Sequence, residues 1–233
     1  MNLFIAGGKI MTKEIKMTNS SKKINKGVNI LLYNFIKRVF DIVASLIFLL
    51  VLLPVVLIIS ILIKISDRGP IFFIQKRIGK NGDIFNMYKF RSMVMNADSV
   101  LEEMLKDEEV FKDYHKNKKL KNDPRVTKIG SIIRKLSLDE LPQLLNVLKG
   151  NMSLIGNRPY LPREMKDMGE YYNDIIKTKP GITGYWQVSG RSNISFKKRL
   201  ELEKFYSNNA NLALDVKIFF LTIYVVLSGH GAE

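Results

Sequence analysis

The longest apolar run in the chain, from Ile42 to Ile63, contains no charged residue. At about 1.5 Å per residue, a helix of this length just crosses a hydrocarbon core of about 30 Å. Pro54 lies near the middle of the run, where it removes a helical hydrogen bond and kinks the helix. The pattern predicts a re-entrant helix with both ends on the cytoplasmic face or a kinked spanning helix. A core helix of a soluble protein is disfavoured because the run is apolar on all sides.

The segment after this run predicts a β-hairpin, because two β-prone stretches, 71–74 and 84–88, flank a Gly/Asn turn at 79–82. Farther along the chain, apolar periodicity and turn residues predict a series of helices and one loop. The expected elements are a charged helix at 97–116, two helical pieces within 129–148 ended by Gly150, a helix at 162–176, a loop at 178–191, an amphipathic helix at 196–206 and an apolar segment at 212–227 that is either interfacial or core.

Charge and composition narrow the function classes. Lys and Arg total 37 and Asp and Glu total 22, a net charge of +15, which predicts a polyanionic partner: nucleic acid, anionic lipid or a phosphorylated substrate. The chain has no cysteine and only two histidines, which excludes a disulfide framework and disfavours zinc or a His-based triad. Any metal is therefore expected to be Mg²⁺ or Mn²⁺, held by carboxylates and phosphates.

Two adjacent carboxylates, Asp139 and Glu140, lie in the stretch from Ser137 to Pro142. One interpretation is a capping box, in which Ser137 and Glu140 satisfy amides of the first helical turn. A helix N-terminus also favours negative charge and attracts phosphate. We therefore expect Asp139 to stay ionised and to be able to attack phosphorus, with Glu140 holding Mg²⁺ on the phosphates.

Such a carboxylate pair requires nearby cations, because like charges repel. Arginine forks suit phosphate oxygens, although most arginines are solvated surface residues. The candidate cations are Lys89, Arg91, Arg125, Arg134, Arg158 and Arg191. A loop at 179–191 concentrates glycines around Trp186, which either stacks a nucleobase or packs in the core.

Several motifs, in this order, make the chain resemble the bacterial polyisoprenyl-phosphate sugar-1-phosphate transferases, which are monotopic phosphoglycosyl transferases. Each motif alone is weak, but together they cover most of the chain. They are Lys37-Arg38-Val39-Phe40-Asp41, Gly69 to Gln75, Tyr88 to Met93, Asp123 to Thr127, Leu138 to Gln143, Gly156-Asn157-Arg158-Pro159, and Pro180 to Gly184 through Gly190-Arg191.

The resemblance implies transfer of a sugar-1-phosphate from a UDP-sugar to undecaprenyl phosphate, with release of UMP, as the first membrane step of capsule, exopolysaccharide or O-antigen assembly. It implies a covalent phosphosugar on Asp139, Mg²⁺ held with the help of Glu140, and phosphate or donor binding by Lys89, Arg134 and Arg158. The implied partners are UDP-sugar, undecaprenyl phosphate and membrane lipid, without nucleic acid. Direct transfer without a covalent intermediate stays open, as does a homodimer.

The resemblance also implies a fold, in which the proline-broken helix is re-entrant. We expect a mostly helical α+β protein, membrane-associated and monotopic, with a small β-hairpin and interfacial amphipathic helices. Its expected parts are a basic, poorly ordered tail at 1–35, a re-entrant membrane helix at 36–65 kinked at Pro54, and a cytosolic catalytic domain at 66–233. The location implied is the cytoplasmic face of the bacterial inner membrane.

Two departures from the family pattern limit these expectations. The chain resembles the minimal form, without the spanning helices and soluble domain of larger members. Glu203 stands where many members have Asp, and it joins Gln187 and Arg191 among the substrate-binding candidates. The stretch from Trp186 to Arg191 resembles members that handle galactose or glucose phosphate more than members that handle N-acetylated sugars. The alternative function is a non-catalytic, membrane-bound protein that binds polyanions.

Overall fold

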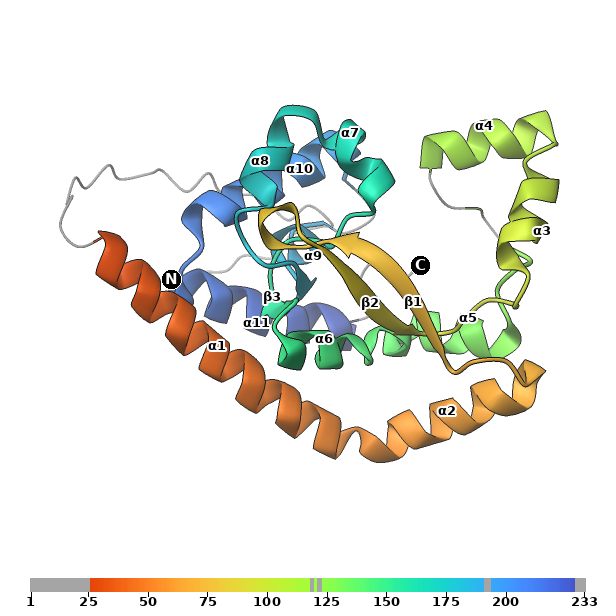
Figure 1. Ribbon diagram of the computed structural model, residues 1–233, viewed down its shortest axis with the longest axis horizontal. Coiled ribbons are helices and arrows are strands. Elements are labelled where there is room, and N and C mark those ends of the chain that lie inside the picture. The colour runs from red at the N-terminus through yellow and green to blue at the C-terminus, as the bar shows by residue number, and fades with distance from the viewer. Residues whose placement is uncertain (1–25, 118–119, 121–122, 191–193, 229–233) are drawn as a thin grey trace.

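The computed structural model describes residues 26–117, 120, 123–190 and 194–228. It is mostly helical, with an antiparallel hairpin β1–β2 and a short parallel pair β3–β4 (Figure 1). This agrees with the predicted mostly helical α+β fold. The elements are α1 (Lys26–Val51), α2 (Leu53–Asp67), β1 (Phe72–Ile78), β2 (Ile84–Phe90), α3 (Ala97–Met104), α4 (Glu108–Asn117), α5 (Lys128–Lys135), α6 (Gln143–Lys149), β3 (Ser153–Ile155), α7 (Met165–Met168), α8 (Tyr172–Ile175), β4 (Gly181–Thr183), α9 (Tyr185–Val188), α10 (Phe196–Asn209) and α11 (Leu212–Ser228), with 3₁₀ turns at Lys80–Gly82, Leu138–Glu140, Pro162–Glu164 and Gly169–Tyr171.

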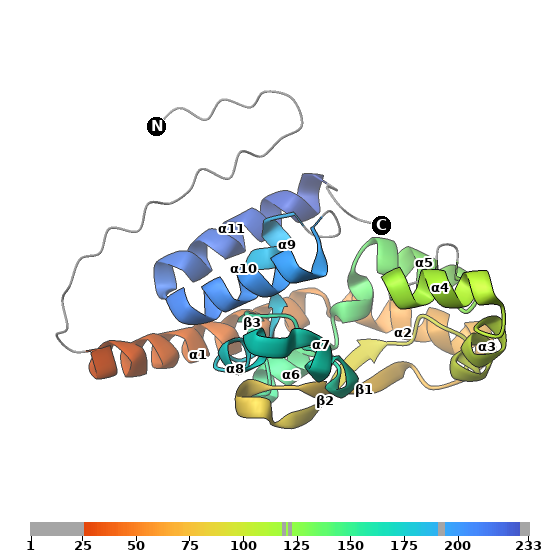
Figure 2. The same cartoon turned by 90° about the horizontal axis from the view of Figure 1, so that it is seen from above.

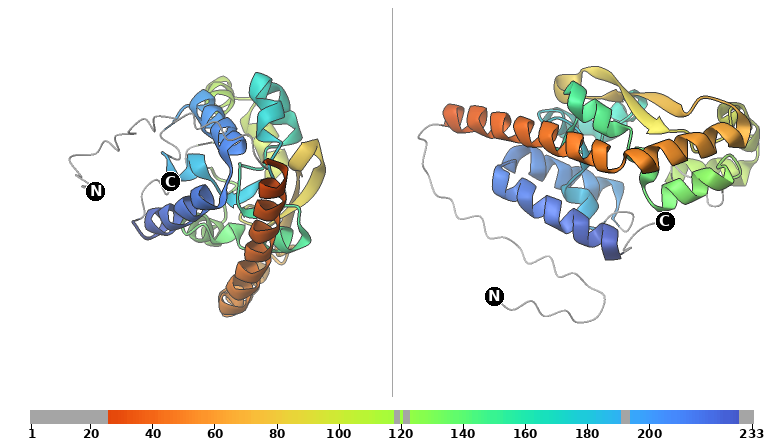
Figure 3. Two further views of the ribbon diagram at one scale, coloured as in Figure 1. Left: turned by 90° about the vertical axis from the view of Figure 1, so that its left-hand side faces the viewer. Right: turned by 90° about the horizontal axis from the view of Figure 1, so that it is seen from below.

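Helices α1 and α2 form a bent pair that crosses the width of the molecule, with the hairpin on one side and α11 on the other (Figure 3). The bend is 62° and lies at Leu52, next to Pro54 in the first turn of α2. No single helix of the described residues is long and apolar enough to cross a membrane, whereas this pair passes the same test jointly. Many large apolar side chains on both arms are exposed, among them Leu50, Leu57 and Ile65.

The boundary predicted for the N-terminal tail requires correction. Helix α1 begins at Lys26, so residues 26–35 are helical rather than part of a tail. The remainder of the predicted tail, 1–25, lies outside the described residues.

The predicted hairpin is confirmed. Strands β1 and β2 pair antiparallel along their whole length, with Phe73 opposite Lys89 and Arg77 opposite Phe85. Because side chains alternate across a strand, Phe73, Arg77 and Lys89 lie on the same face of the hairpin. The connecting turn places Asn81 and Gly82 at positive φ, of 59° and 90°.

Other predicted elements are broken more often than expected. The charged helix at 97–116 is two helices, because Asp107 accepts hydrogen bonds from the amides of Glu109 and Val110 and starts α4. The two helices lie at the end of the molecule near α5 (Figure 2). The helix at 162–176 is a series of short turns around Gly169, which has φ 51°. The loop prediction for 178–191 is wrong, because β4 pairs with β3 and α9 follows it.

The main apolar core lies between the hairpin, α6, β3, α10 and α11. Its buried members are Phe85, Met87, Leu144, Val147, Met152, Leu154, Ile155, Tyr206 and Ile218. Helix α1 closes this core, since Ala44 and Leu49 pack against it. Helix α2 instead packs in a second cluster, in which Ile59 and Ile63 lie against Phe90 and Ile133.

Candidate active site

The two adjacent carboxylates and one lysine form the centre of the site. Lys89 Nζ lies 2.8 Å from Glu140 Oε1 and 3.5 Å from Asp139 Oδ2. The lysine is on β2, and the carboxylates are in the 3₁₀ turn Leu138–Glu140 between α5 and α6. Asp139 is buried, and the Glu140 side chain keeps 34% exposure. One cation thus holds both carboxylates at the edge of the protein surface.

The turn that carries these carboxylates is set by Ser137. This residue adopts a left-handed conformation with φ 55°, and its side chain makes no capping hydrogen bond. The capping-box interpretation is therefore wrong. Helix α5 ends at Lys135 and α6 starts only after Pro142, so Asp139 and Glu140 precede the helix instead of opening it.

Asn146 on α6 couples the carboxylate turn to the strand that carries the lysine. Its Oδ1 accepts from the backbone amide of Tyr88 at 2.9 Å, and its Nδ2 donates to the carbonyl of Asn86 at 2.7 Å. Asn146 is fully buried, so these bonds replace ladder partners that β2 lacks on this edge. The position of Lys89 therefore depends on α6 as well as on the hairpin.

The two carboxylates differ electrostatically. Burial raises the pKa of Asp139, while Lys89 and Arg134 act to lower it. Burial would also raise the pKa of Glu140, but the ion pair with Lys89 and the charge of Arg158 hold it below its ordinary value. Glu140 is consequently the more firmly ionised group, and Asp139 depends on its neighbouring cations to stay charged.

The structure brings some of the candidate cations together and not others. Arg134 donates from Nε to Ser92 Oγ at 2.8 Å, and its charge reaches Asp139. Arg91 instead pairs with Asp67 at the end of α2. Arg125 is held by Asp123, with 2.5 Å between Arg125 Nη2 and Asp123 Oδ2. These last two guanidinium groups are therefore engaged away from the carboxylate turn.

The remaining candidates that the structure describes have protein partners of their own. Gln187 donates from Nε2 to the carbonyl of Ile182 at 3.2 Å, within its own segment. Trp186 faces Arg199, whose guanidinium carbon lies 5.2 Å from the ring centroid, so this ring is occupied by a cation. Glu203 is 1% exposed and contacts the backbone of Arg158. Arg191 lies outside the described residues.

Arg77 is a charged residue of this region that the sequence interpretation missed. It is buried, donates from Nη1 to the carbonyl of Pro159 at 2.9 Å, and donates from Nη2 to Gln75 Oε1 at 2.6 Å. Burial and the nearby charge of Arg158 lower its pKa to about 10. The alternation of the hairpin was the available signal, because Arg77 shares a face with Lys89.

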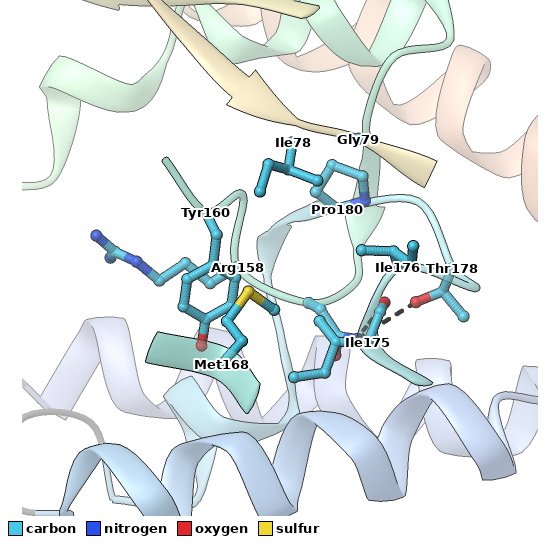
Figure 4. A pocket seen from close by; sticks show the side chains of 10 residues that line it. Ile78, Gly79, Arg158, Tyr160, Met168, Ile175, Ile176, Thr178 and Pro180 are labelled. Atoms are coloured by element: carbon cyan, nitrogen blue, oxygen red, sulfur yellow. Dashed lines mark hydrogen bonds between the residues drawn. The ribbon is translucent and has the colours of Figure 1, made fainter. Parts of the chain in front are cut away.

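A small cavity lies beside Arg158 and is lined mainly by apolar side chains, including Ile78, Tyr160 and Met168 (Figure 4). Its volume is about 10 Å³, roughly the space of one water molecule. In Figure 4 the guanidinium of Arg158 extends away from this cavity. The cavity is too small for a sugar nucleotide.

The carboxylates also define what metal chemistry the site suits. Across the part of the chain that the structure describes, no three Asp, Glu or His side chains gather as a metal cage. Mg²⁺ commonly binds through one or two carboxylates together with substrate phosphates and water. Glu140, ionised and one-third exposed beside Asp139, fits that donor set.

The arrangement combines a buried carboxylate, an ionised neighbour and several cations. A carboxylate can attack a phosphorus atom, and cations around it offset the charge of a phosphorylated ligand. Lys89, Arg134 and Arg158 surround this point, while Arg77 adds a fourth cation beside Arg158. The site is therefore suited to group transfer from a phosphate-containing substrate.

Comparison with known proteins gives a consistent result. Residues 32–229 match the family model described as bacterial sugar transferase. The chain is 45% identical over 200 residues to the undecaprenyl-phosphate galactose phosphotransferase of Salmonella typhimurium. The aligned region covers 85% of this chain and 42% of that protein. It is 42% identical to the exopolysaccharide production protein ExoY of Sinorhizobium fredii, covering 84% of this chain and 87% of the relative. An N-acetylgalactosaminephosphotransferase of Aeromonas hydrophila that acts on undecaprenyl phosphate is 39% identical, over 87% of this chain and 46% of its own length. The chain thus spans less than half the length of the Salmonella and Aeromonas relatives.

Proposed function

The chain belongs to the bacterial sugar transferase family, and from this premise we propose that it moves a sugar-1-phosphate from a UDP-sugar to undecaprenyl phosphate and releases UMP. The product is an undecaprenyl diphosphate sugar, which starts assembly of a surface glycan. Relatives named for undecaprenyl-phosphate galactose and N-acetylgalactosamine transfer support the reaction class. The observation that carries the proposal is the joint contact of Lys89 with Asp139 and Glu140.

The proposed first step is attack by an Asp139 oxygen on the phosphorus that bears the sugar. The bond from this phosphorus to the bridging oxygen breaks, and UMP leaves with the electron pair. An oxygen of undecaprenyl phosphate then attacks the same phosphorus, and the bond to Asp139 breaks to restore the carboxylate. The burial of Asp139 supports this role, because a poorly solvated carboxylate is a better nucleophile than one in water.

The cations of the site have separate roles in this proposal. Lys89 keeps both carboxylates oriented, while Arg134 and Arg158 bind the donor phosphates. Glu140 is the residue that would hold Mg²⁺ together with those phosphates. When bound, the ion supplies positive charge for the oxygens that gain charge during transfer.

We also propose that α1 and α2 dip into the inner membrane from its cytoplasmic face. The exposed apolar side chains of both arms and the bend at Leu52 support this placement. The absence of native cysteine permits a direct test by single-cysteine labelling of Asn34→Cys and Arg68→Cys in spheroplasts and in inverted vesicles. A re-entrant pair requires both positions to react only from the cytoplasmic side, and reaction from opposite sides would identify a spanning helix.

The reaction is tested by UMP release in membranes that contain the protein, with undecaprenyl phosphate, Mg²⁺ and a panel of UDP-sugars. The panel consists of UDP-galactose, UDP-glucose, UDP-N-acetylgalactosamine and UDP-N-acetylglucosamine. Wild-type protein should release UMP with at least one donor, and galactose and glucose donors are the first expectation. Asp139→Asn should abolish this release and remain in the membrane fraction.

A matched control separates a lost nucleophile from a lost negative charge. Asp167→Asn makes the same chemical change at an exposed carboxylate on α7 and should retain wild-type turnover. Incubation with donor alone should leave a phosphosugar adduct on wild-type protein, detected by intact mass, and none on Asp139→Asn. UMP release without an adduct at any time point would favour direct transfer. The absence of UMP with every donor would refute the reaction itself and leave polyanion binding as the alternative.

A further inference from the structure

Glu203 on α10 is a buried carboxylate whose hydrogen bonds go to the segment that carries Arg158. Its Oε1 accepts from the backbone amide of Arg158 at 3.1 Å, and its Oε2 accepts from the hydroxyl of Tyr160 at 2.6 Å. Both donors are uncharged, and the residue is 1% exposed. The carboxylate therefore has no room to bind a substrate itself, but it fixes two points on either side of Pro159.

A second residue of the same helix face holds the other end of this segment. Ser207, one helical turn beyond Glu203, accepts from Asn157 Nδ2 at 2.6 Å. Residues four apart lie on one face of a helix, so α10 presents both groups to 157–160 together. Glu203 and Ser207 thus anchor the segment at the Arg158 backbone and at the side chains of Asn157 and Tyr160.

The Arg158 side chain, which extends from this anchored backbone, has a hydrogen-bond donor that no protein group uses. Its Nε is buried and has no hydrogen-bond partner. Its guanidinium extends away from the apolar cavity in Figure 4, and its charge reaches Glu140. A guanidinium whose charge reaches Glu140 is close enough to the carboxylate turn to bind phosphate oxygens of a ligand there.

We propose that Glu203 is a positioning residue, whose carboxylate fixes the Arg158 backbone so that the guanidinium meets the diphosphate of the donor. This inference rests on the proposed function. Loss of a charge-assisted hydrogen bond should let the 157–160 segment shift, and an ångström of looseness at a binding residue is costly. Because Arg158 would contact the phosphates before and during transfer, the loss should appear in donor KM more than in kcat.

The charges around Glu203 give the inference a pH signature. The titratable and charged groups that act on it are Arg158 and Tyr160 from the anchored segment and Arg199 from its own helix. On the facing helix α8, Asp174 is paired with Lys204 at 3.1 Å, and α9 presents no charged residue. Burial raises the pKa of Glu203 to about 7, against hydrogen bonds that lower it. Below that pH the carboxyl is protonated and accepts fewer hydrogen bonds, so the donor KM should rise as the pH falls.

The experiment measures kcat and KM for the best UDP-sugar donor from pH 6 to 8.5, at saturating undecaprenyl phosphate. Glu203→Gln keeps the shape and removes the charge, and Tyr160→Phe removes one of the two donors. Glu201→Gln makes the identical change two residues away, at an exposed side chain paired with Lys198, and is the matched control. Circular dichroism of each variant reports folding.

Glu203→Gln should raise the donor KM about tenfold at pH 8 with kcat within about threefold of wild type. Its KM should also lose the rise seen in wild type below pH 7, and Tyr160→Phe should show a smaller rise in KM. Glu201→Gln should match wild type.

A KM for Glu203→Gln within twofold of wild type, or a fall in kcat with KM unchanged, would overturn the inference. Should Glu203→Gln not fold, an unchanged KM in Tyr160→Phe overturns it in the same way. Failure of the proposed function itself is distinct, because wild type would then release no UMP.

Discussion

Replacement of Lys89 by methionine removes the only cation that contacts both carboxylates of the site in the described structure, at nearly constant side-chain length. At an effective dielectric constant of about 20, a charge pair separated by 3.5 Å is worth about 5 kcal/mol, which is an upper bound. The Lys89 side chain keeps 24% exposure and that of Asp139 12%, so we take solvent screening to reduce this interaction energy by about half. We therefore expect Lys89→Met to raise the activation free energy by about 2–3 kcal/mol. This corresponds to a fall in turnover of about 30- to 150-fold near neutral pH.

The direction of the pH effect follows from the same contact. Burial already raises the pKa of Asp139, and Lys89 opposes that rise. Without Lys89 the pKa of Asp139 rises further, so a larger share of the nucleophile is protonated at a given pH. The acid limb of kcat in the UMP-release assay should therefore move to higher pH in Lys89→Met.

Two controls make this result interpretable. Lys89→Arg keeps the charge and should retain the wild-type acid limb, even if turnover falls because a guanidinium has a different shape. Lys76→Met removes an exposed cation from β1 of the same hairpin and should change neither turnover nor the pH profile. An acid limb in Lys89→Met that coincides with wild type would refute the electrostatic role assigned to this lysine.

Two predictions concern stability. Asn146→Ala removes both side-chain hydrogen bonds to β2, to Tyr88 and Asn86, and should cost about 2–4 kcal/mol in urea unfolding; a cost below about 1 kcal/mol would contradict the coupling of α6 to the hairpin. Gly181→Ala places a Cβ 2.1 Å from the backbone nitrogen of Gly156, so it should lower the free energy of unfolding by about 3 kcal/mol or more and reduce Tm clearly. An unchanged Tm would mean that β3 and β4 separate at little cost.

Local chemistry was enough to predict several elements. The turn at 79–82 and the flanking β-prone runs specify the hairpin, which the structure confirms strand by strand. Gly150 ends α6 at a φ of 84°, a conformation that glycine adopts without strain. Pro54 predicts a break, and the bend lies at the preceding turn of the chain. In each case one or two residues impose a backbone conformation regardless of the rest of the fold.

Other elements depend on contacts that the linear pattern does not contain. The stretch from Ser137 to Glu140 satisfies the sequence rule for a capping box, yet Ser137 adopts a left-handed conformation and its side chain makes no capping hydrogen bond. The segment 181–183 becomes a strand only because β3, distant in sequence, offers a parallel partner. Gly156 and Gly181 let the backbones of the β3 and β4 segments approach closely. The glycine-rich composition of the segment predicted as a loop therefore reflects tight backbone packing rather than irregular structure.

The candidate site shows the same division. Asp139 and Glu140 are adjacent in sequence, and the hairpin brings Lys89 to them. Arg91 and Arg125 belong to the same motifs, but their guanidinium groups pair with Asp67 and Asp123. A sequence pattern identifies which residue types a site needs. Which of several arginines serves the site depends on which carboxylate lies next to each one in the folded protein.

Arg38 and Asp41, which precede the apolar run, connect α1 to α6 and β3 by hydrogen bonds. Composition alone could not assign this role. Arg38 donates to the carbonyls of Val147 and Leu148 at the end of α6, at 2.5 and 2.7 Å. Asp41 is buried and accepts from the hydroxyl of Ser153 and the amide of Leu154, both at 3.0 Å, at the start of β3. Helix α6 follows the carboxylate turn, and β3 leads directly to the segment that carries Arg158. The helix that we propose to lie in the bilayer is thus hydrogen-bonded to the elements on both sides of the site. Under the proposed function, its depth in the lipid would determine how far Asp139 lies from the phosphate of undecaprenyl phosphate.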